Sequence, residues 1–79
     1  MENEAIRKFY EVCENTYTKS FPYVKDKIKL VPYNDGFKIY VNGVWFVTVD
    51  EWETIERERL STYVYCSIRL ANTEEFRPL

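Results

Sequence analysis

The sequence predicts a small α+β domain, in which an antiparallel sheet packs against helices. Three observations support this class. Residues 3–19 separate apolar from polar side chains at helical spacing. An Asn-Gly pair at positions 42 and 43 lies between two runs of β-branched and aromatic residues, which is the strongest short-range signal of a β-hairpin. Asp50 and Glu53 then have the spacing of a capping box, which indicates the start of a second helix.

The first helix is predicted over residues 3–19. Asn3 is the expected N-cap, because its side chain can accept hydrogen bonds from the free backbone N–H groups of the first turn, and Glu4 adds a favourable charge there. Phe21-Pro22 is expected to end the helix, because the residue before a proline avoids the α-helical region. The apolar side of this helix consists of Ala5, Ile6, Phe9, Tyr10, Val12, Cys13, Thr16 and Tyr17.

The first strand is predicted over residues 27–33, at an edge of the sheet, because Pro32 has no N–H to donate to a neighbouring strand. A two-residue turn at positions 35 and 36 would set Leu30 opposite Val41. A three-residue turn would instead move Lys29 to the apolar face. We prefer the two-residue turn, because it places apolar residues together on one face: Ile28, Leu30, Ile39, Val41, Val44 and Phe46.

The second hairpin joins the runs on either side of Asn42-Gly43. A tight turn there sets Ile39 opposite Phe46 on the face expected under the first helix. It sets Tyr40 opposite Trp45 on the other face. Such cross-strand aromatic pairs stabilise a sheet by about 0.2–1 kcal/mol each, so this pair is explained either by structure or by binding.

The segment after the second hairpin is harder to interpret. Residues 50–60 are predicted as a short helix that contacts the core through Trp52, Ile55 and Leu60. Residues 61–70 alternate apolar and polar side chains and are rich in β-branched and aromatic residues, which favours a fourth strand and the order α-β-β-β-α-β. The same residues also share a helical face with Trp52, so one helix over 50–71 and the order α-β-β-β-α is the alternative. Residues 72–79 are expected to be a flexible tail.

Length and composition predict a single domain over residues 1–79, with 46% hydrophobic residues and a net charge of −2. The acidic N-terminus lacks the apolar stretch of a signal peptide, and no run is long enough to span a bilayer, so we expect a cytoplasmic protein and no membrane partner. Cys13 and Cys66 are both expected on apolar faces as reduced thiols, although a bridge between them is possible if the first helix crosses the last element.

The residue types available argue against an enzyme. Histidine is absent, which removes the most common general base and metal ligand. Two distant cysteines do not make a zinc site, and the two glycines, Gly36 and Gly43, do not form a phosphate-binding loop. We therefore expect no catalytic residues, no metal and no cofactor.

A protein-binding surface is the function that the sequence favours. The chain has seven tyrosines and two tryptophans, which are residue types enriched at binding hot spots. The expected aromatic contacts are Tyr40, Trp45, Tyr63 and Tyr65, and the expected acidic contacts of the second helix are Glu51, Glu53 and Glu56. The partner would be another protein or a second copy of the chain. A short acidic domain without catalytic residues suits a small regulator or inhibitor, such as one that a virus or mobile element encodes to act on a host protein.

Single-stranded nucleic acid is the alternative partner. Basic and aromatic residues alternate in the sheet region, an arrangement by which sheets hold single strands. The residues of this alternative are Lys25, Lys27, Lys29, Lys38 and Tyr33. The order of helix, three strands and helix resembles double-stranded-RNA-binding domains in outline. However, the basic helix N-terminus and the glycine-proline loop of that family are missing, so its function is not carried over.

Overall fold

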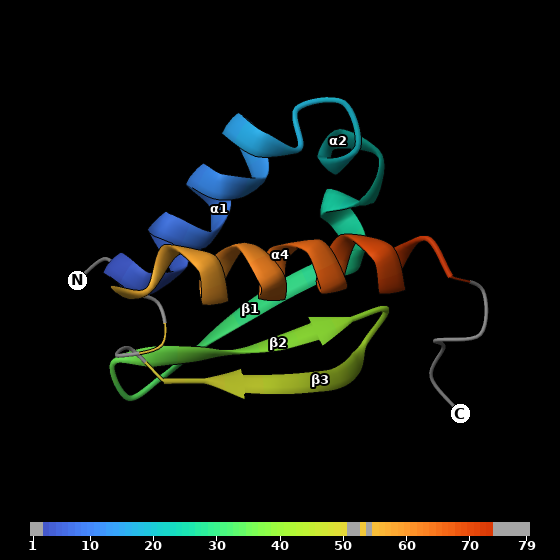
Figure 1. The fold of residues 1–79 in the computed structure, drawn as a ribbon. Helices are drawn as coiled ribbons and strands as arrows, with labels where there is room; N and C mark the ends of the chain where they lie inside the picture. The colour runs from blue at the N-terminus through green and yellow to red at the C-terminus, as the bar shows by residue number, and fades with distance from the viewer. Residues whose placement is uncertain (1–2, 51–52, 54, 74–79) are drawn as a thin grey trace.

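The computed structural model describes residues 3–50, 53 and 55–73. Its elements follow the chain in the order α1 (Glu4–Thr16), α2 (Phe21–Val24), the 3-10 helix η1 (Lys25–Lys27), β1 (Ile28–Tyr33), β2 (Gly36–Val41), β3 (Val44–Val49) and α4 (Arg57–Ala71). Figure 1 shows this arrangement. The N-terminal helix, the antiparallel three-stranded sheet and the C-terminal helix confirm the predicted α+β class.

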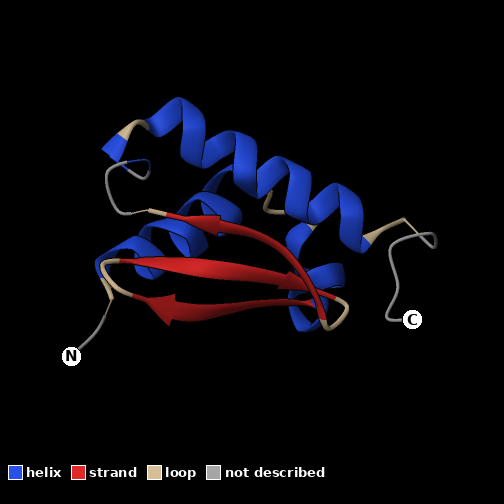
Figure 2. Ribbon diagram, turned by 90° about the horizontal axis from the view of Figure 1, so that it is seen from below, coloured by secondary structure: helices blue, strands red, loops and turns tan. Residues whose placement is uncertain are grey.

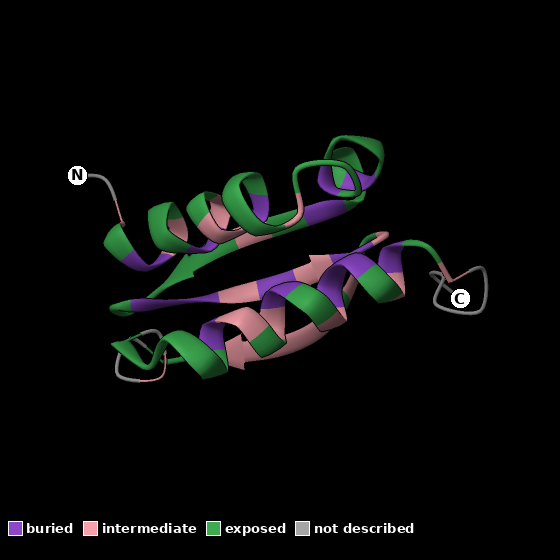
Figure 3. Cartoon of the chain, turned by 45° about the horizontal axis from the view of Figure 1, so that its top comes forward, coloured by how far each residue is buried: buried purple, intermediate pink, exposed green. Residues whose placement is uncertain are grey.

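The molecule has two layers. The strands form one open sheet in the order β1-β2-β3, and α1, α2 and α4 lie on the same side of it (Figure 1). Seen from below, the three strands lie side by side (Figure 2). Buried residues gather where the helices face the sheet, and exposed residues cover the outer sides of the helices (Figure 3). One face of the sheet is therefore not covered by any helix of the described chain.

The helices and the inner face of the sheet enclose one hydrophobic core. Phe9 is fully buried and its ring meets the ring of Phe37 edge to face, with 5.5 Å between centroids. This contact joins the middle of α1 to the start of β2. The buried members of the core are Ala5, Phe9, Cys13, Phe21, Val24, Ile28, Phe37, Ile39, Val41, Val49, Leu60, Val64, Ile68 and Ala71.

The N-terminal helix begins as predicted and ends earlier. The Asn3 side chain accepts hydrogen bonds from the backbone N–H groups of Ala5 and Ile6, at 2.9 and 3.2 Å, which confirms the N-cap. The helix ends at Thr16 and not at the proline. Pro22 instead lies in the first turn of α2. A backbone N–H in this turn has no acceptor within the helix, so a proline is tolerated there. The prediction that the proline ends the first helix was therefore wrong.

The first hairpin has a different turn from the one predicted. Asn34 and Asp35 form the turn, and Asn34 adopts a left-handed φ of 51°. Leu30 therefore lies opposite Ile39 and not opposite Val41. Because this shift is two residues, every side chain keeps its predicted face, as the side-chain period of a strand is two.

The second hairpin confirms the Asn-Gly turn. Asn42 and Gly43 both have positive φ, 54° and 82°, as a type I′ turn requires. Tyr40 lies opposite Trp45 as predicted. Beyond this pair the register shifts by one residue, so Ile39 lies opposite Val47 and the predicted pairing with Phe46 was wrong. An extra residue in one strand is a β-bulge, which no local sequence signal indicated.

The predicted fourth strand does not exist. Residues 61–70 lie within α4, as the alternative order proposed. Helical spacing places the buried residues Leu60, Val64, Ile68 and Ala71 on one side of this helix, facing the sheet and α1. This common face outweighs the strand propensity of individual residues, because burial decides helix stability more than propensity does.

The segment before α4 was predicted only in part. Asp50 donates its backbone N–H to the Glu53 carboxylate at 3.0 Å, which is one half of the expected capping box. Ile55 is 72% exposed, so its predicted core contact was wrong. The predicted contact of Trp52 lies outside the described residues, as does most of the predicted tail, positions 74–79.

Cys13 and Cys66 are both free thiols in this fold. Cys13 is fully buried, and burial raises the pKa of its thiol to about 12, with a smaller contribution from the charge of Glu14. Within the described part of the chain, no helix is both long and apolar enough to cross a membrane.

Candidate functional site

The uncovered side of the sheet is the candidate site, and we call it the open face. Strand alternation assigns residues to it, since successive side chains point to opposite sides. Trp45 is 55% exposed, and Tyr33 and Val31 are exposed as well. The members of the open face are Lys29, Val31, Tyr33, Lys38, Tyr40, Trp45 and Thr48.

Strand pairing arranges most of these side chains in two rows that cross all three strands. In the first row, Lys29 lies opposite Tyr40, which lies opposite Trp45. In the second row, Val31 lies opposite Lys38, which lies opposite Thr48. Each row thus combines one lysine with uncharged side chains. On β1 and β2 the rows are two residues apart, about 6.6 Å along the strand, and the bulge adds one residue between them on β3.

Contacts within the open face hold two of its side chains in place. The indole N–H of Trp45 donates a hydrogen bond to the hydroxyl of Thr48 at 3.2 Å, so the ring is directed from the first row towards the second. The ammonium group of Lys38 lies over the ring of Tyr33, at 4.7 Å from its centroid. A cation over an aromatic ring is attracted by about 0.5–1 kcal/mol at an exposed site. Both contacts reduce the freedom that these side chains would lose on binding.

A hollow of about 470 Å³ lies beside the first row, where β1 meets the turn of the second hairpin. Tyr40 and Val31 contribute apolar walls, and Lys27 and Lys29 contribute the positive charges. Asp26 is the acidic residue among those that line it. The hollow therefore places an aromatic ring next to two ammonium groups.

Charge is unevenly distributed between the two layers. The strands contain two lysines, Lys29 and Lys38, and no Asp or Glu. Most of the described acidic residues lie on the helices or just before α4, while Asp35 and Asp50 lie in the loops that flank the strands. Several acidic residues of the helices are paired: Arg7 bridges Glu4 and Glu11 on α1, at 2.7 and 3.1 Å. The hydrogen bond from Arg7 also holds the pKa of Glu4 below its ordinary value. The charged side chains that the strands place on the open face are thus both positive, although the whole chain has a net charge of −2.

The structure separates the residues of the predicted protein interface. Tyr40 and Trp45 are neighbours on the open face, but Tyr63 and Tyr65 lie on α4, in the helical layer. The Tyr63 hydroxyl donates to the Glu53 carboxylate at 2.8 Å, and burial together with this bond raises the pKa of Tyr63. The predicted alignment of all four aromatic residues on one sheet face was wrong, because it required residues 61–70 to be a strand.

The predicted acidic contacts are not a set of free carboxylates. Glu53 accepts hydrogen bonds from Asp50 and Tyr63, so it ties the end of β3 to α4. Glu56 forms an ion pair with Arg59 at 2.9 Å. Glu51 lies outside the described residues. The described carboxylates of this group therefore have structural partners.

The structure places the residues predicted for nucleic-acid binding on or next to one face of the sheet. Lys29, Lys38 and Tyr33 lie on the open face. Lys25 and Lys27 belong to η1, the turn of helix that leads directly into β1. Sequence reasoning missed Val31 and Thr48 as members of this surface, although the alternation of β1 indicated Val31.

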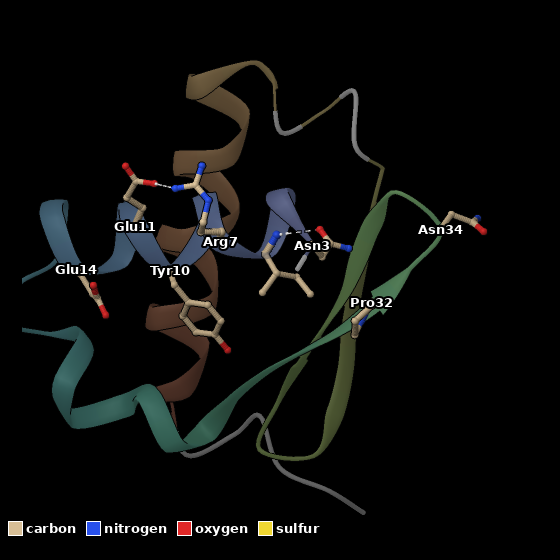
Figure 4. Close-up of a pocket in the computed structure, with 8 residues that line it drawn as sticks. Asn3, Arg7, Tyr10, Glu11, Glu14, Pro32 and Asn34 are labelled. Atoms are coloured by element: carbon tan, nitrogen blue, oxygen red, sulfur yellow. Dashed lines mark hydrogen bonds and ion pairs between the residues drawn. The ribbon is translucent and has the colours of Figure 1, made fainter. Parts of the chain in front are cut away.

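A second hollow, of about 720 Å³, lies between α1 and the first hairpin and is drawn in Figure 4. Its polar groups are largely engaged within the protein. The Asn3 side chain caps α1 and donates to the carbonyl oxygen of Gly36 at 2.9 Å, and Arg7 pairs with Glu11. Tyr10 also lines the hollow and is half-buried, and burial raises its pKa. The Asn3 hydrogen bonds thus stabilise the start of α1 and tie it to β2.

The residues that the structure describes contain no group of three or more His, Cys, Asp or Glu side chains that could hold a metal ion. Comparison with protein-family models, with curated proteins and with solved structures found no match for this chain.

Proposed function

We propose that this chain is a non-enzymatic, macromolecule-binding module and that the open face is its binding surface. The observation that carries the proposal is the position of Trp45, which is 55% exposed on the uncovered face and held by Thr48. A large aromatic side chain kept half-exposed in a fixed orientation provides binding area at a low entropic cost. Such a module regulates or inhibits by occupying a site on its partner.

A protein partner is supported by the aromatic residues of this surface. Tyrosine and tryptophan dominate binding hot spots, and Tyr40 and Trp45 are adjacent in the first row. A second copy of the chain is a special case of such a partner. The open face spans only three short strands, so a protein bound there would need neighbouring surface to reach the roughly 800 Å² per partner of a standard interface.

The proposal is tested by capturing partners from the cells that produce the protein, with three versions of the bait. The first is the wild type, the second is Trp45→Ala, and the third is Tyr23→Ala. Tyr23 is a matched control, because it is an aromatic residue that is 84% exposed on α2, in the helical layer. Mass spectrometry and nucleic-acid staining then identify what each bait retains.

A partner retained by the wild type and by Tyr23→Ala, but lost by Trp45→Ala, supports the open face as the binding surface. Treatment of the captured material with nuclease separates protein partners from nucleic acid. Retention of the same partner by all three baits, with equal yield, would place binding elsewhere and overturn the proposal. Circular dichroism of each bait ensures that the comparison is made between folded proteins.

A further inference from the structure

We infer that the occupant of the open face is single-stranded nucleic acid. This inference rests on the proposed function, since it names the partner class of the same surface. Two properties of the open face support it, which are the sign of its charge and the arrangement of its rings.

The charge of the open face favours an anionic partner. Lys29 and Lys38 lie in adjacent rows, and the strands around them carry no carboxylate. Lys27 adds a third ammonium group in the hollow beside Tyr40, against the single carboxylate of Asp26. A chain with regularly repeated negative charges, such as a phosphate backbone, can pair with these groups in succession.

The aromatic rings favour a partner that has flat faces of its own. Aromatic side chains on a sheet act as stacking platforms for bases and tolerate any base sequence. Trp45 and Tyr40 are the platforms available in the free protein, since the ring of Tyr33 is covered by the ammonium group of Lys38. Movement of Lys38 to a phosphate would uncover Tyr33 as a third platform.

The positions of the rings favour a single strand over a duplex. Tyr40 and Trp45 both lie in the first row, and Tyr33 lies two rows further along the sheet, about 13 Å away. A base can stack on one of these exposed rings only if it is unpaired and separated from its neighbours, which a duplex resists. An acidic protein can pair with the lysines, but a nucleic-acid strand offers phosphates and flat ring faces in regular alternation.

The test measures fluorescence anisotropy of fluorescein-labelled oligonucleotides, dT12 and U12, at low salt. A 12-base-pair duplex and a labelled decaglutamate peptide serve as competing partner classes. We expect saturable binding of both single strands and much weaker binding of the duplex and the peptide. The variants are Trp45→Ala, Lys38→Gln and Lys29→Gln, with Tyr23→Ala and Lys8→Gln as controls on exposed positions of the helical layer.

Loss of one stacking platform in Trp45→Ala should weaken binding at least about fivefold. Each lysine variant should lower the slope of log affinity against log salt by about 0.7, the value for one phosphate contact with a single strand. The two control variants should change neither quantity. Lys29 is exposed and Lys38 is half-buried, so we expect both lysine variants to fold. They therefore test the inference even if Trp45→Ala is unstable.

Absence of saturable oligonucleotide binding at low salt would overturn the inference. Equal binding of duplex and single strand would do the same, as would affinity unchanged in Trp45→Ala. Binding of decaglutamate in place of the oligonucleotides would assign the lysines to an acidic protein. In each of these cases, the capture experiment with Trp45→Ala and Tyr23→Ala still decides independently whether the open face is a binding surface.

Discussion

Gly36 is the position where the structure predicts a large effect from one added methyl group. This residue is buried in β2, and its carbonyl oxygen accepts a hydrogen bond from the Asn3 side chain at 2.9 Å. A Cβ atom at this position would lie 1.9 Å from the carbonyl oxygen of Val49 and 2.9 Å from its carbonyl carbon. Both are backbone atoms of the neighbouring strand, so no side-chain rotation can relieve the contact.

The expected cost follows from the displacement that the methyl group requires. Close carbon–oxygen contacts in sheets are about 3.3 Å or longer, so β3 would have to move by about 1.4 Å at Val49. This movement would disturb the pairing of Val49 with Phe37, and both residues are fully buried. Overpacking costs about 1–3 kcal/mol, and more when the backbone must shift. We therefore expect Gly36→Ala to lower the free energy of unfolding by at least about 3 kcal/mol.

A loss of this size is measurable in a small domain. Total stability at this length is about 4–12 kcal/mol, and each kcal/mol shifts the melting temperature by about 4–8 °C. Gly36→Ala should therefore lower the melting temperature by at least about 12 °C. Gly43→Ala is the matched control, because its positive φ of 82° costs an alanine only about 1–2 kcal/mol. Thermal and urea unfolding followed by circular dichroism would refute the steric argument if Gly36→Ala were no less stable than Gly43→Ala.

Three further outcomes are expected. Trp45→Ala should cost only about 1 kcal/mol in urea unfolding, because half of the side chain is already exposed and chiefly its cross-strand aromatic pair is lost; a loss of several kcal/mol would show that it belongs to the core. Asn3→Ala should cost about 1–2 kcal/mol through the lost cap, and Asn3→Asp, which keeps the cap but cannot donate to Gly36, should cost less. The buried Cys13 thiol has a pKa of about 12 against an ordinary 9.0, so the folded state keeps a proton that the unfolded state loses. This contribution to stability is complete below about pH 9 and is lost as the pH rises towards 12; urea midpoints from pH 8 to 10.5 should fall more steeply for the wild type than for Cys13→Ala.

The parts of the fold that sequence predicted are those with local physical signals. The N-cap of α1 depends on Asn3 and the three residues after it, and the hairpin turn depends on Asn42 and Gly43 alone. Each signal specifies backbone geometry within a few residues, so no knowledge of the rest of the fold is needed. The fold class followed from these signals.

The parts that sequence did not predict depend on contacts between distant segments. The bulge at Phe46 shifts the pairing of β3 so that Val49 lies in the core opposite Phe37. Gly36 lies in β2, where its backbone closely approaches that of Val49. The sequence alone predicts this glycine to be a turn residue. Both features are consequences of how the third strand meets the second.

The predicted aromatic surface was wrong because residues 61–70 fit the spacing of both a strand and a helix. Residues 61–70 alternate like a strand, yet Val64, Ile68 and Ala71 also repeat at helical spacing, and only packing against α1 and the sheet distinguishes the two. The helix removed Tyr63 and Tyr65 from the predicted aromatic surface.

The two-layer arrangement also explains why an acidic chain can present a positive surface. Most of the described carboxylates lie on the helices or just before α4, where arginines such as Arg7 and Arg59 pair with some of them, while Asp35 and Asp50 lie in the loops that flank the strands. The strands carry lysines alone, and their outer face has no helix over it. At physiological ionic strength charges more than about 8 Å apart are largely screened, so a ligand on the open face responds to Lys29 and Lys38 rather than to the net charge. The sign of the local charge, and not the isoelectric point, therefore determines which partners this surface can bind.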